Sequence, residues 1–334
     1  MKISASIYSD KKRPLKDVVL DLVAHQVDLL HVDCNDDVSV FEDIKKIRTW
    51  CDLPIDLHII TPYPSKYRDL IRDIPVEYVT FQYEDLQEKI EFPSNFSGKK
   101  GLAVITPTDI SVFQEYEDFD FILVMATIPG QSGGVFDTFN FSKIRKFKKI
   151  YPAKSIHVDG GVNGEVSFIL RNMGVSSSVS GSYLFNGPSI GHALMNLTKR
   201  NVESQFVLRD FMIPLAESPV IHESNLSFKN ILETIEKGKL GFAIVVRENN
   251  EYVGLVSNAD VRKSLLNSID DLTNLNVTSM INTDSVEIQE RATVNDMLQL
   301  IKKYAFPITY LPVLDEAKNA VGIVTFVNLI RGEI

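Results

Sequence analysis

Eight short apolar segments alternate with amphipathic segments along roughly the first 200 residues, and this alternation constrains the fold more than any other feature. The apolar segments are residues 2–8, 27–33, 55–60, 78–83, 101–106, 121–126, 155–161 and 177–185. Helical patterns lie between them, most clearly at 14–26, 41–50, 139–151 and 165–174. Strands that alternate with helices form parallel βαβ units. Eight such units predict an α/β fold closed into a (β/α)8 TIM barrel, with an open doubly wound sheet as the alternative.

The rest of the chain contains an internal repeat. Residues 241–265 are echoed by residues 308–331, with Gly254 and Gly322 at equivalent positions. Each copy has the pattern of a helix, a strand, a polar turn, a second strand and a second helix, so the two copies are expected to bury their apolar faces against each other. The expected domains are 1–200 and 205–334, and the second divides into copies at about 205–272 and 273–334.

Charge and cysteine content exclude several classes of protein. The formal net charge of −9 gives the chain no general attraction for nucleic acid or for an anionic membrane. Cys34 and Cys51 are too few for a disulfide framework. No secretory signal and no apolar stretch of about 18 residues is found. We therefore expect a cytoplasmic protein.

Metal-ligating residue types end three of the expected strands. His31 and Asp33 end the second, His58 lies near the end of the third, and Asp159 ends the seventh. In a (β/α)8 barrel these ends meet at one rim, where reactive groups gather. A single histidine at a strand end is more often a hydrogen-bonded structural residue. Two imidazoles and two carboxylates together predict a site for a divalent metal such as Zn²⁺, Fe²⁺, Mn²⁺ or Co²⁺.

Glycine-rich loops follow the last three expected strands, at residues 125–136, 159–163 and 180–185. Glycine lets the backbone approach a ligand closely and direct several N–H groups at one anion. The loops after strands seven and eight commonly bind phosphate in this type of barrel. These loops therefore predict a phosphorylated ligand.

Residues 1–200 resemble the ribulose-phosphate 3-epimerase family. The resemblance rests on SASIYS, LLHVD, LPIDLHII, VMATIPGQSGGVFDTFNFSKI, IHVDGGVN and VSGSYLF, in that order. It implies that His31, Asp33, His58 and Asp159 bind the metal, and that Asp33 and Asp159 also transfer protons. It further implies a substrate and phosphate site made of Ser6, Gly133, Gly134, Gly160, Gly161, Gly181 and Ser182.

The chain departs from the family pattern around the reacting carbon. Asn35 stands where the family has methionine, Ile59 and Ile60 follow His58 where the family has methionine, and Gln82 replaces a histidine. Two interpretations stay open. One is a 3-epimerase of ribulose 5-phosphate and xylulose 5-phosphate, or of a related sugar phosphate, working through an enediolate. The other is a catalytically idle sugar-phosphate-binding barrel that acts as a nucleotide-responsive scaffold or regulator.

Residues 205–334 resemble a tandem pair of CBS domains. The motif GLVSNAD contains Ser257 and Asp260, and GIVTFVN contains Thr325 and Asn328. The resemblance implies an adenine nucleotide effector in these clefts, with Asp260 accepting hydrogen bonds from the ribose hydroxyls. Asn328 can accept only through its carbonyl oxygen, so the cleft at Asp260 is the better candidate. The resemblance also implies a homo-oligomer, formed through the CBS pair or the barrel.

Overall fold

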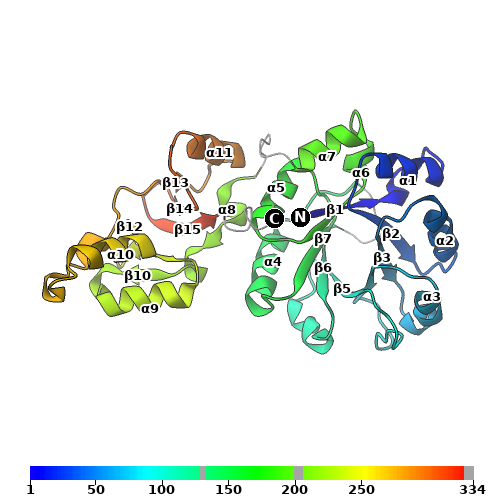
Figure 1. Ribbon diagram of the computed structural model, residues 1–334, viewed down its shortest axis with the longest axis horizontal. Coiled ribbons are helices and arrows are strands. Elements are labelled where there is room, and N and C mark those ends of the chain that lie inside the picture. The colour runs from blue at the N-terminus through cyan, green and yellow to red at the C-terminus, as the bar shows by residue number, and fades with distance from the viewer. Residues whose placement is uncertain (128–132, 199–205, 327–334) are drawn as a thin grey trace. The chain divides into compact units, whose positions relative to one another are not determined.

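The computed structural model describes residues 1–127, 133–198 and 206–326, which form two compact units (Figure 1). The first unit is made of the described residues up to 198, and the second begins at residue 206. None of the described helices combines the length and apolarity that crossing a membrane requires.

The first unit is a closed barrel of eight parallel strands that pair in chain order. The strands are β1 Lys2–Ser6, β2 Leu29–Asn35, β3 Ile55–Ile60, β4 Tyr78–Gln82, β5 Lys99–Ile105, β6 Phe121–Met125, β7 Ser155–Asp159 and β8 Ser177–Ser180. Figure 1 shows helices around the barrel. They are η1 Ile7–Ser9, α1 Leu15–Ala24, α2 Val40–Trp50, η2 Pro64–Tyr67, α3 Arg68–Asp73, η3 Ile110–Tyr116, α4 Phe139–Ile150, α5 Gly164–Asn172, α6 Ser182–Phe185 and α7 Ile190–Thr198. The predicted TIM barrel is confirmed.

One predicted strand is shorter than expected. The eighth ends at Ser180, and residues 182–185 form the short helix α6. Gly181 separates the two elements, with backbone angles outside the strand region. The apolar residues after Gly181 continue the buried surface from a helix, where Leu184 is buried.

The strands present different side chains to the helices and to the barrel interior. Val32 and Leu57 point outward and are fully buried under the helices. The residues on either side of each of these in the same strand point inward. His31 on β2 pairs with Asp56 on β3. On the opposite side of the interior, Ala103, Phe121, Leu123 and Met125 form an apolar cluster on β5 and β6. The polar residues that build the site are thus confined to part of the barrel wall.

The second unit contains two sheets, ordered β10-β11-β12 and β13-β14-β15-β9. Its strands are β9 Ile213–Pro214, β10 Val220–His222, β11 Phe242–Val246, β12 Tyr252–Ser257, β13 Ile288–Gln289, β14 Tyr310–Leu314 and β15 Ala320–Thr325. Its helices are α8 Leu208–Phe211, η4 Leu215–Glu217, η5 Glu223–Asn225, α9 Phe228–Gly238, α10 Asn258–Asn267, η6 Leu272–Asn274, η7 Thr278–Met280 and α11 Val294–Lys302. The predicted repeat is visible as α9-β11-β12-α10 and α11-β14-β15. The second helix predicted for the second copy lies outside the described residues.

The repeated glycines have a structural reason. Gly254 pairs with Val245 across one hairpin, and Gly322 pairs with Val313 at the same place in the other. A Cβ atom on Gly254 would lie 2.6 Å from the carbonyl oxygen of Asn282, and one on Gly322 would collide with a backbone oxygen of the adjacent β9. Each glycine therefore lets a segment from the other half of the repeat pack against its hairpin.

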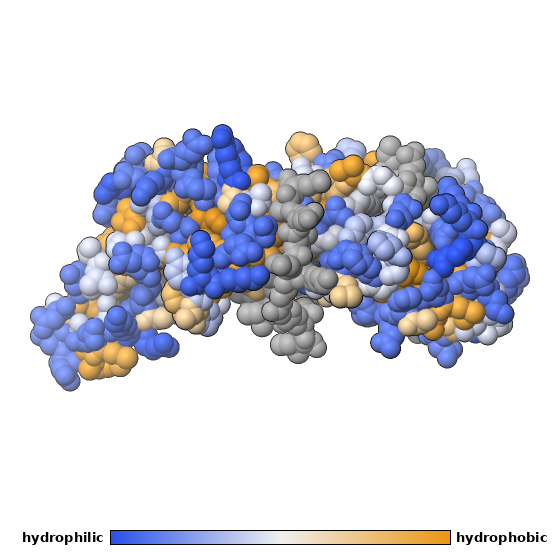
Figure 2. Space-filling model, turned by 90° about the horizontal axis from the view of Figure 1, so that it is seen from above, coloured by the Kyte–Doolittle hydropathy of each residue, from blue (hydrophilic) through white to orange (hydrophobic). Residues whose placement is uncertain are grey.

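The face of each unit that Figure 2 shows is largely polar. Figure 2 shows hydrophilic residues over most of the visible face of each unit, with hydrophobic residues in small patches. The second unit buries its apolar side chains in two clusters, one around Ile231 and Val245 and one around Phe242 and Ile323. The second cluster takes residues from both copies, as the repeat predicted.

Candidate active site

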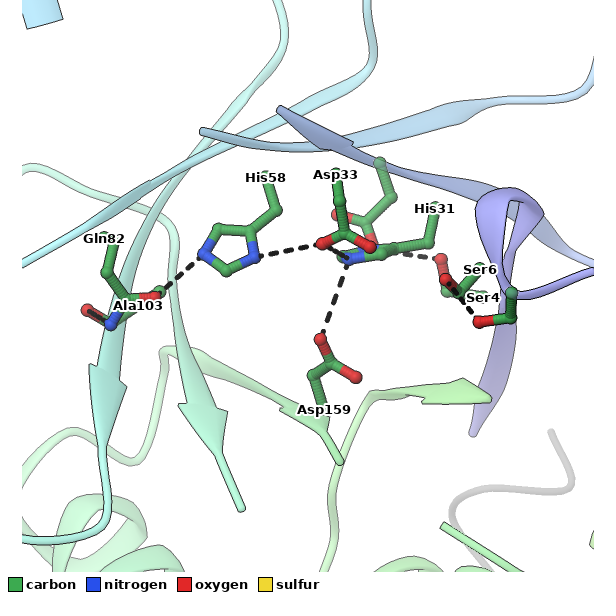
Figure 3. Close-up of polar contacts among 10 residues, drawn as sticks. Ser4, Ser6, His31, Asp33, His58, Gln82, Ala103 and Asp159 are labelled. Atoms are coloured by element: carbon green, nitrogen blue, oxygen red, sulfur yellow. Dashed lines mark hydrogen bonds and ion pairs between the residues drawn. The ribbon is translucent and has the colours of Figure 1, made fainter. Parts of the chain in front are cut away.

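Four side chains from three strands converge at the carboxyl-terminal end of the barrel (Figure 3). His31, Asp33, His58 and Asp159 each offer one ligand atom, and these atoms all lie within 4.8 Å of one another. His31 Nε2 lies 3.2 Å from Asp33 Oδ1 and 3.7 Å from Asp159 Oδ2, and His58 Nδ1 lies 3.6 Å from Asp33 Oδ1. The closed barrel thus brings together the four residues that the sequence predicted as a metal site.

The four side chains differ in exposure. Both imidazole rings are fully buried, whereas the Asp33 and Asp159 side chains are 22% and 19% exposed. The carboxylates therefore form the accessible side of the cluster, and the histidines form its floor. A molecule that enters from the barrel mouth reaches Asp33 and Asp159 first.

A buried carboxylate orients His31. Asp56 Oδ2 lies 3.0 Å from His31 Nδ1 and also accepts a hydrogen bond of 2.9 Å from Ser4 Oγ. An ionised carboxylate can only accept hydrogen bonds, so His31 Nδ1 carries a proton. His31 Nε2 therefore points toward Asp33 and Asp159. Such a carboxylate behind a histidine is common at metal sites, where it fixes the ring and raises its basicity.

His58 is oriented by an amide. Its Nε2 lies 2.9 Å from Gln82 Oε1, which is an acceptor. Its Nδ1 is buried and has no hydrogen-bond partner among the described residues, because Asp33 at 3.6 Å is too distant. A buried nitrogen without a partner is costly and uncommon. This one faces Asp33 and the centre of the cluster.

In the cluster without metal, the pKa values of the two carboxyl groups shift in opposite directions. Burial raises the pKa of Asp159 to about 6, and the nearby charge of Asp33 adds to the shift. Burial acts in the same direction on Asp33, but the attraction of His31 outweighs it and lowers the pKa of Asp33. Burial also disfavours a charged His31, yet Asp33 and Asp56 raise the pKa of His31 well above its usual range. Asp33 is thus ionised beside a protonated His31, whereas Asp159 holds a proton up to higher pH.

The cluster has the properties of a divalent-metal site. The outer nitrogens of His31 and His58 are engaged by Asp56 and Gln82, which leaves the inner nitrogens for a cation. A cation would satisfy the buried His58 Nδ1 and would replace the proton on His31 Nε2. Two nitrogens and two carboxylates suit first-row divalent metals. The residues present therefore fit such a metal.

The predicted phosphate-binding residues lie at the ends of β6, β7 and β8. Gly160 and Gly161 have φ of +110° and +66°, and a Cβ atom on either would collide with the backbone of the segment after β6. Gly134 packs against the same segment, at Thr127. Gly133 has φ of +89° and open space around it. Close loop packing alone thus explains the glycines after β7, and their role toward phosphate stays a prediction.

Ser6 and the loop after β8 lie side by side. Ser6 ends β1, is 8% exposed and accepts a hydrogen bond of 3.0 Å from Ser9 Oγ. A Cβ atom on Gly181 would lie 3.2 Å from Ser6 Cβ, and Ser182 begins α6 directly after it. Ser6 ends β1 and Gly181 follows β8, the neighbour of β1 in the barrel, so both lie at the same rim as His31, Asp33, His58 and Asp159.

The predicted nucleotide-binding residues of the second unit make local contacts. Asp260 Oδ2 accepts a hydrogen bond of 2.9 Å from Ser257 N, and Asp260 N donates one of 3.3 Å to Ser257 Oγ, which together form a capping box at the start of α10. Thr325 ends β15, opposite Tyr310. Asn328 lies outside the described residues. Nucleotide binding by these residues stays a prediction.

Two groups behind the two histidine rings were missed in the sequence. Asp56 lies two residues before His58 and therefore on the same face of β3, a spacing that could have revealed it. Gln82 was recognised only as a departure from the family pattern. Its contact with His58 depends on the register of β3 and β4.

Comparisons with known proteins match two family models to this chain. A model of the ribulose-phosphate 3 epimerase family matches residues 2–185, and a model of the CBS domain matches residues 208–267 and 277–333. The ribulose-phosphate 3-epimerase of Bacillus subtilis is 25% identical over 200 residues, which cover 55% of this chain and 92% of that protein. That of Methanocaldococcus jannaschii is 26% identical over 230 residues, which cover 64% and 95%. Among solved structures, the CBS-pair protein CBSX2 from Arabidopsis thaliana is 24% identical over 38% of this chain and 94% of its own, with a TM-score of 0.32. The family models confirm both resemblances seen in the sequence.

Proposed function

The chain belongs to the ribulose-phosphate 3-epimerase family, and from this premise we propose that its barrel is a metal-dependent 3-epimerase of a ketose phosphate. The substrate is ribulose 5-phosphate, with xylulose 5-phosphate as its epimer, or a related sugar phosphate. The observation that carries the proposal is the cluster of His31, Asp33, His58 and Asp159, whose ligand atoms lie within 4.8 Å of one another.

The metal and the two aspartates have separate tasks. His31, Asp33, His58 and Asp159 would hold a divalent cation, which would supply positive charge near the oxyanion that develops when a ketose loses its C3 proton. Asp33 and Asp159 stand on β2 and β7, with β1 and β8 between them in the barrel. They therefore reach the mouth from different sides, as inversion of a carbon centre requires.

The proton balance follows from this arrangement. One aspartate takes the C3 proton as a carboxylate, and the C–H electron pair delocalises into the C2 carbonyl to give a planar enediolate. The other, as a carboxylic acid, returns a proton to the opposite face of C3. The two aspartates have then exchanged protonation states.

The glycine loops would hold the substrate phosphate. Gly133 and Gly134, Gly160 and Gly161, and Gly181 with Ser182 follow three adjacent strands. Backbone N–H groups in such loops bind anions without a positive side chain. With the phosphate fixed at this part of the rim, the sugar chain extends toward Asp159 and Asp33.

Deuterium exchange tests the proposed chemistry directly. The full-length protein is first analysed for metal and then incubated in D₂O with ribulose 5-phosphate. Incorporation of deuterium at C3, lost on chelation and restored by metal, is the expected result. A bound metal without exchange would show that ribulose 5-phosphate is not the substrate, and other ketose phosphates would then be tested. Absence of both metal and exchange would overturn it and leave an idle sugar-phosphate-binding barrel.

We further propose that the CBS pair binds an adenine nucleotide and adjusts the activity of the barrel. The match of the CBS model to both copies supports this, together with the carboxylate of Asp260 in the first turn of α10, directly after β12. A carboxylate can accept both hydroxyls of a ribose in charge-assisted hydrogen bonds. Calorimetry of the full-length protein with AMP, ADP and ATP tests the site, and no binding of any of them would reject it.

A further inference from the structure

Gln82 connects His58, a candidate metal ligand, to the carboxylate of Glu84 in the turn directly after β4. The side chain is 2% exposed and ends β4 (Figure 3). Its Oε1 faces His58 Nε2 at 2.9 Å, and its Nε2 donates hydrogen bonds to Glu84 Oε2 and, at 3.4 Å, to the carbonyl oxygen of Ala103. Each polar atom of the amide therefore has a buried or half-buried partner.

The chemistry of these partners permits one orientation of the amide. Glu84 as a carboxylate and Ala103 through its carbonyl can only accept hydrogen bonds, so the amide NH₂ group must face them. The amide oxygen must then face His58, and His58 Nε2 must be the protonated ring nitrogen. In a neutral ring, His58 Nδ1 is consequently left with its lone pair directed toward the cluster, where it has no hydrogen-bond partner among the described residues.

Glu84 is itself held in place by the turn after β5. Its other oxygen, Oε1, accepts hydrogen bonds from Ile105 N at 3.1 Å and from the hydroxyl of Thr108. The same turn is held from α4, where the buried Lys143 donates from Nζ to the carbonyl oxygens of Ile105 at 2.5 Å and Thr108 at 2.6 Å. The carboxylate that orients Gln82 is thus anchored to the backbone and cannot easily turn away.

We propose that Gln82 is a positioning residue, which transmits the orientation set by Glu84 to His58 and so presents His58 Nδ1 to the metal. The inference rests on the proposed metal-dependent function. His31 is oriented by the Asp56 carboxylate directly, whereas His58 is oriented by a carboxylate through a neutral amide. The two metal-binding rings therefore differ in how strongly their outer nitrogens are polarised.

The replacement of Gln82 by leucine and by histidine separates orientation from packing. Leucine fills the space but accepts no hydrogen bond. Histidine can accept from His58 with one ring nitrogen and donate to Glu84 with the other. Ser177→Ala is the matched control, because Ser177 is also a buried barrel-strand residue and its Oγ has no partner among the described residues.

Two measurements on the full-length protein test the role. Affinity for Zn²⁺, measured by competition with a chelating dye, should fall about 10- to 100-fold in Gln82→Leu, as for other residues behind metal ligands. It should be largely restored in Gln82→His and unchanged in Ser177→Ala. In the metal-free protein, ¹⁵N spectra of the neutral histidine rings should show His58 as the Nε2–H tautomer in the unsubstituted protein. In Gln82→Leu they should show a mixture of the Nδ1–H and Nε2–H tautomers.

Other outcomes overturn the proposal. Unchanged affinity and an unchanged ring tautomer in Gln82→Leu would remove any positioning role. An equal loss in Gln82→Leu and Gln82→His would assign Gln82 a packing role alone. If Gln82→Leu does not fold, Glu84→Gln takes its place, and it must weaken Zn²⁺ binding in the same direction. If the unsubstituted protein binds no Zn²⁺, the proposed metal dependence fails, while the ring spectra still decide whether Gln82 fixes His58.

Discussion

The two units hold their acidic side chains in different ways. In the barrel, Asp33 and Asp159 meet only because the sheet closes and brings β2 and β7 to one rim. In the second unit, Asp260 contacts Ser257 within one turn of α10, and the same capping box joins Asp296 to Thr293 at the start of α11. Local helix capping accounts for the second arrangement, and nothing local accounts for the first. Convergence of distant polar residues is therefore the stronger indication of a ligand.

The largest expected effect is the loss of catalysis when either aspartate of the barrel is neutralised. Asp33→Asn and Asp159→Asn each remove a proton-transfer group and a metal ligand at once. General acid–base catalysis contributes about 10²- to 10⁴-fold, so C3 deuterium exchange should fall by at least about 10³-fold when the metal is also weakened. Asp260→Asn should leave the rate without nucleotide unchanged. Exchange that persists in Asp159→Asn would contradict the assignment of the acid and the base.

The second effect concerns the stability of the metal-free protein. Asp159 has a folded-state pKa of about 6, which lies above the usual value, so the folded protein binds its proton more tightly than the unfolded chain. Its contribution to stability is complete at low pH and is lost as the pH rises through about 6. Asp159→Asn removes this loss, and at pH 7 the metal-free variant should be more stable by up to about 3 kcal/mol.

Denaturant unfolding of chelated protein between about pH 4 and pH 7 checks this difference, because the free energies of unfolding of the two proteins should converge at the acid end. The contributions of His31 and Asp33 are present in both proteins and largely cancel. If the difference in unfolding free energy does not depend on pH, burial does not raise the pKa of Asp159 in the metal-free protein.

A slightly smaller effect should distinguish the two units by their ligands. A metal that binds the folded barrel alone stabilises it by about 2.7 kcal/mol at 100 times its dissociation constant. Added Zn²⁺ should therefore raise the unfolding temperature of the barrel and leave that of the CBS pair unchanged, whereas AMP should do the reverse. Calorimetric scans of the full chain with each ligand are the measurement. Zn²⁺ that stabilises only the CBS pair would place the metal site outside the barrel.

The sequence predicted the barrel and its four clustered residues because both follow from strand periodicity and strand ends. Parallel strands fix which side chains share a rim, so His31, Asp33, His58 and Asp159 could be grouped without coordinates. The carboxylate and amide behind the two rings could not be paired in the same way. The contact of Asp56 with His31 depends on the stagger between neighbouring strands, which the sequence does not contain.

Short sequence motifs were ambiguous because a structural and a functional role can require the same residues at the same spacing. Ser257 and Asp260 were predicted as nucleotide ligands, but their spacing is also that of a helix start, and the structure shows the capping box. Gly160 and Gly161 were predicted to bind phosphate, and close packing against the segment after β6 also explains why glycine is needed there. A short motif can satisfy a structural and a functional requirement with the same residues.

The smallest effect asks whether Asp260 does more than cap a helix, and Asp296 provides the matched comparison. Asp260→Asn and Asp296→Asn each weaken a capping box, so each should lower the stability of the second unit by about 1 kcal/mol. Only Asp260→Asn should also weaken AMP binding, by roughly tenfold or more, because a charge-assisted hydrogen bond to the ribose would be lost. Calorimetric titration of both variants with AMP measures the difference. If both variants lose AMP affinity equally, the nucleotide depends on the integrity of the fold, and Asp260 resembles Asp296 in having only a structural role.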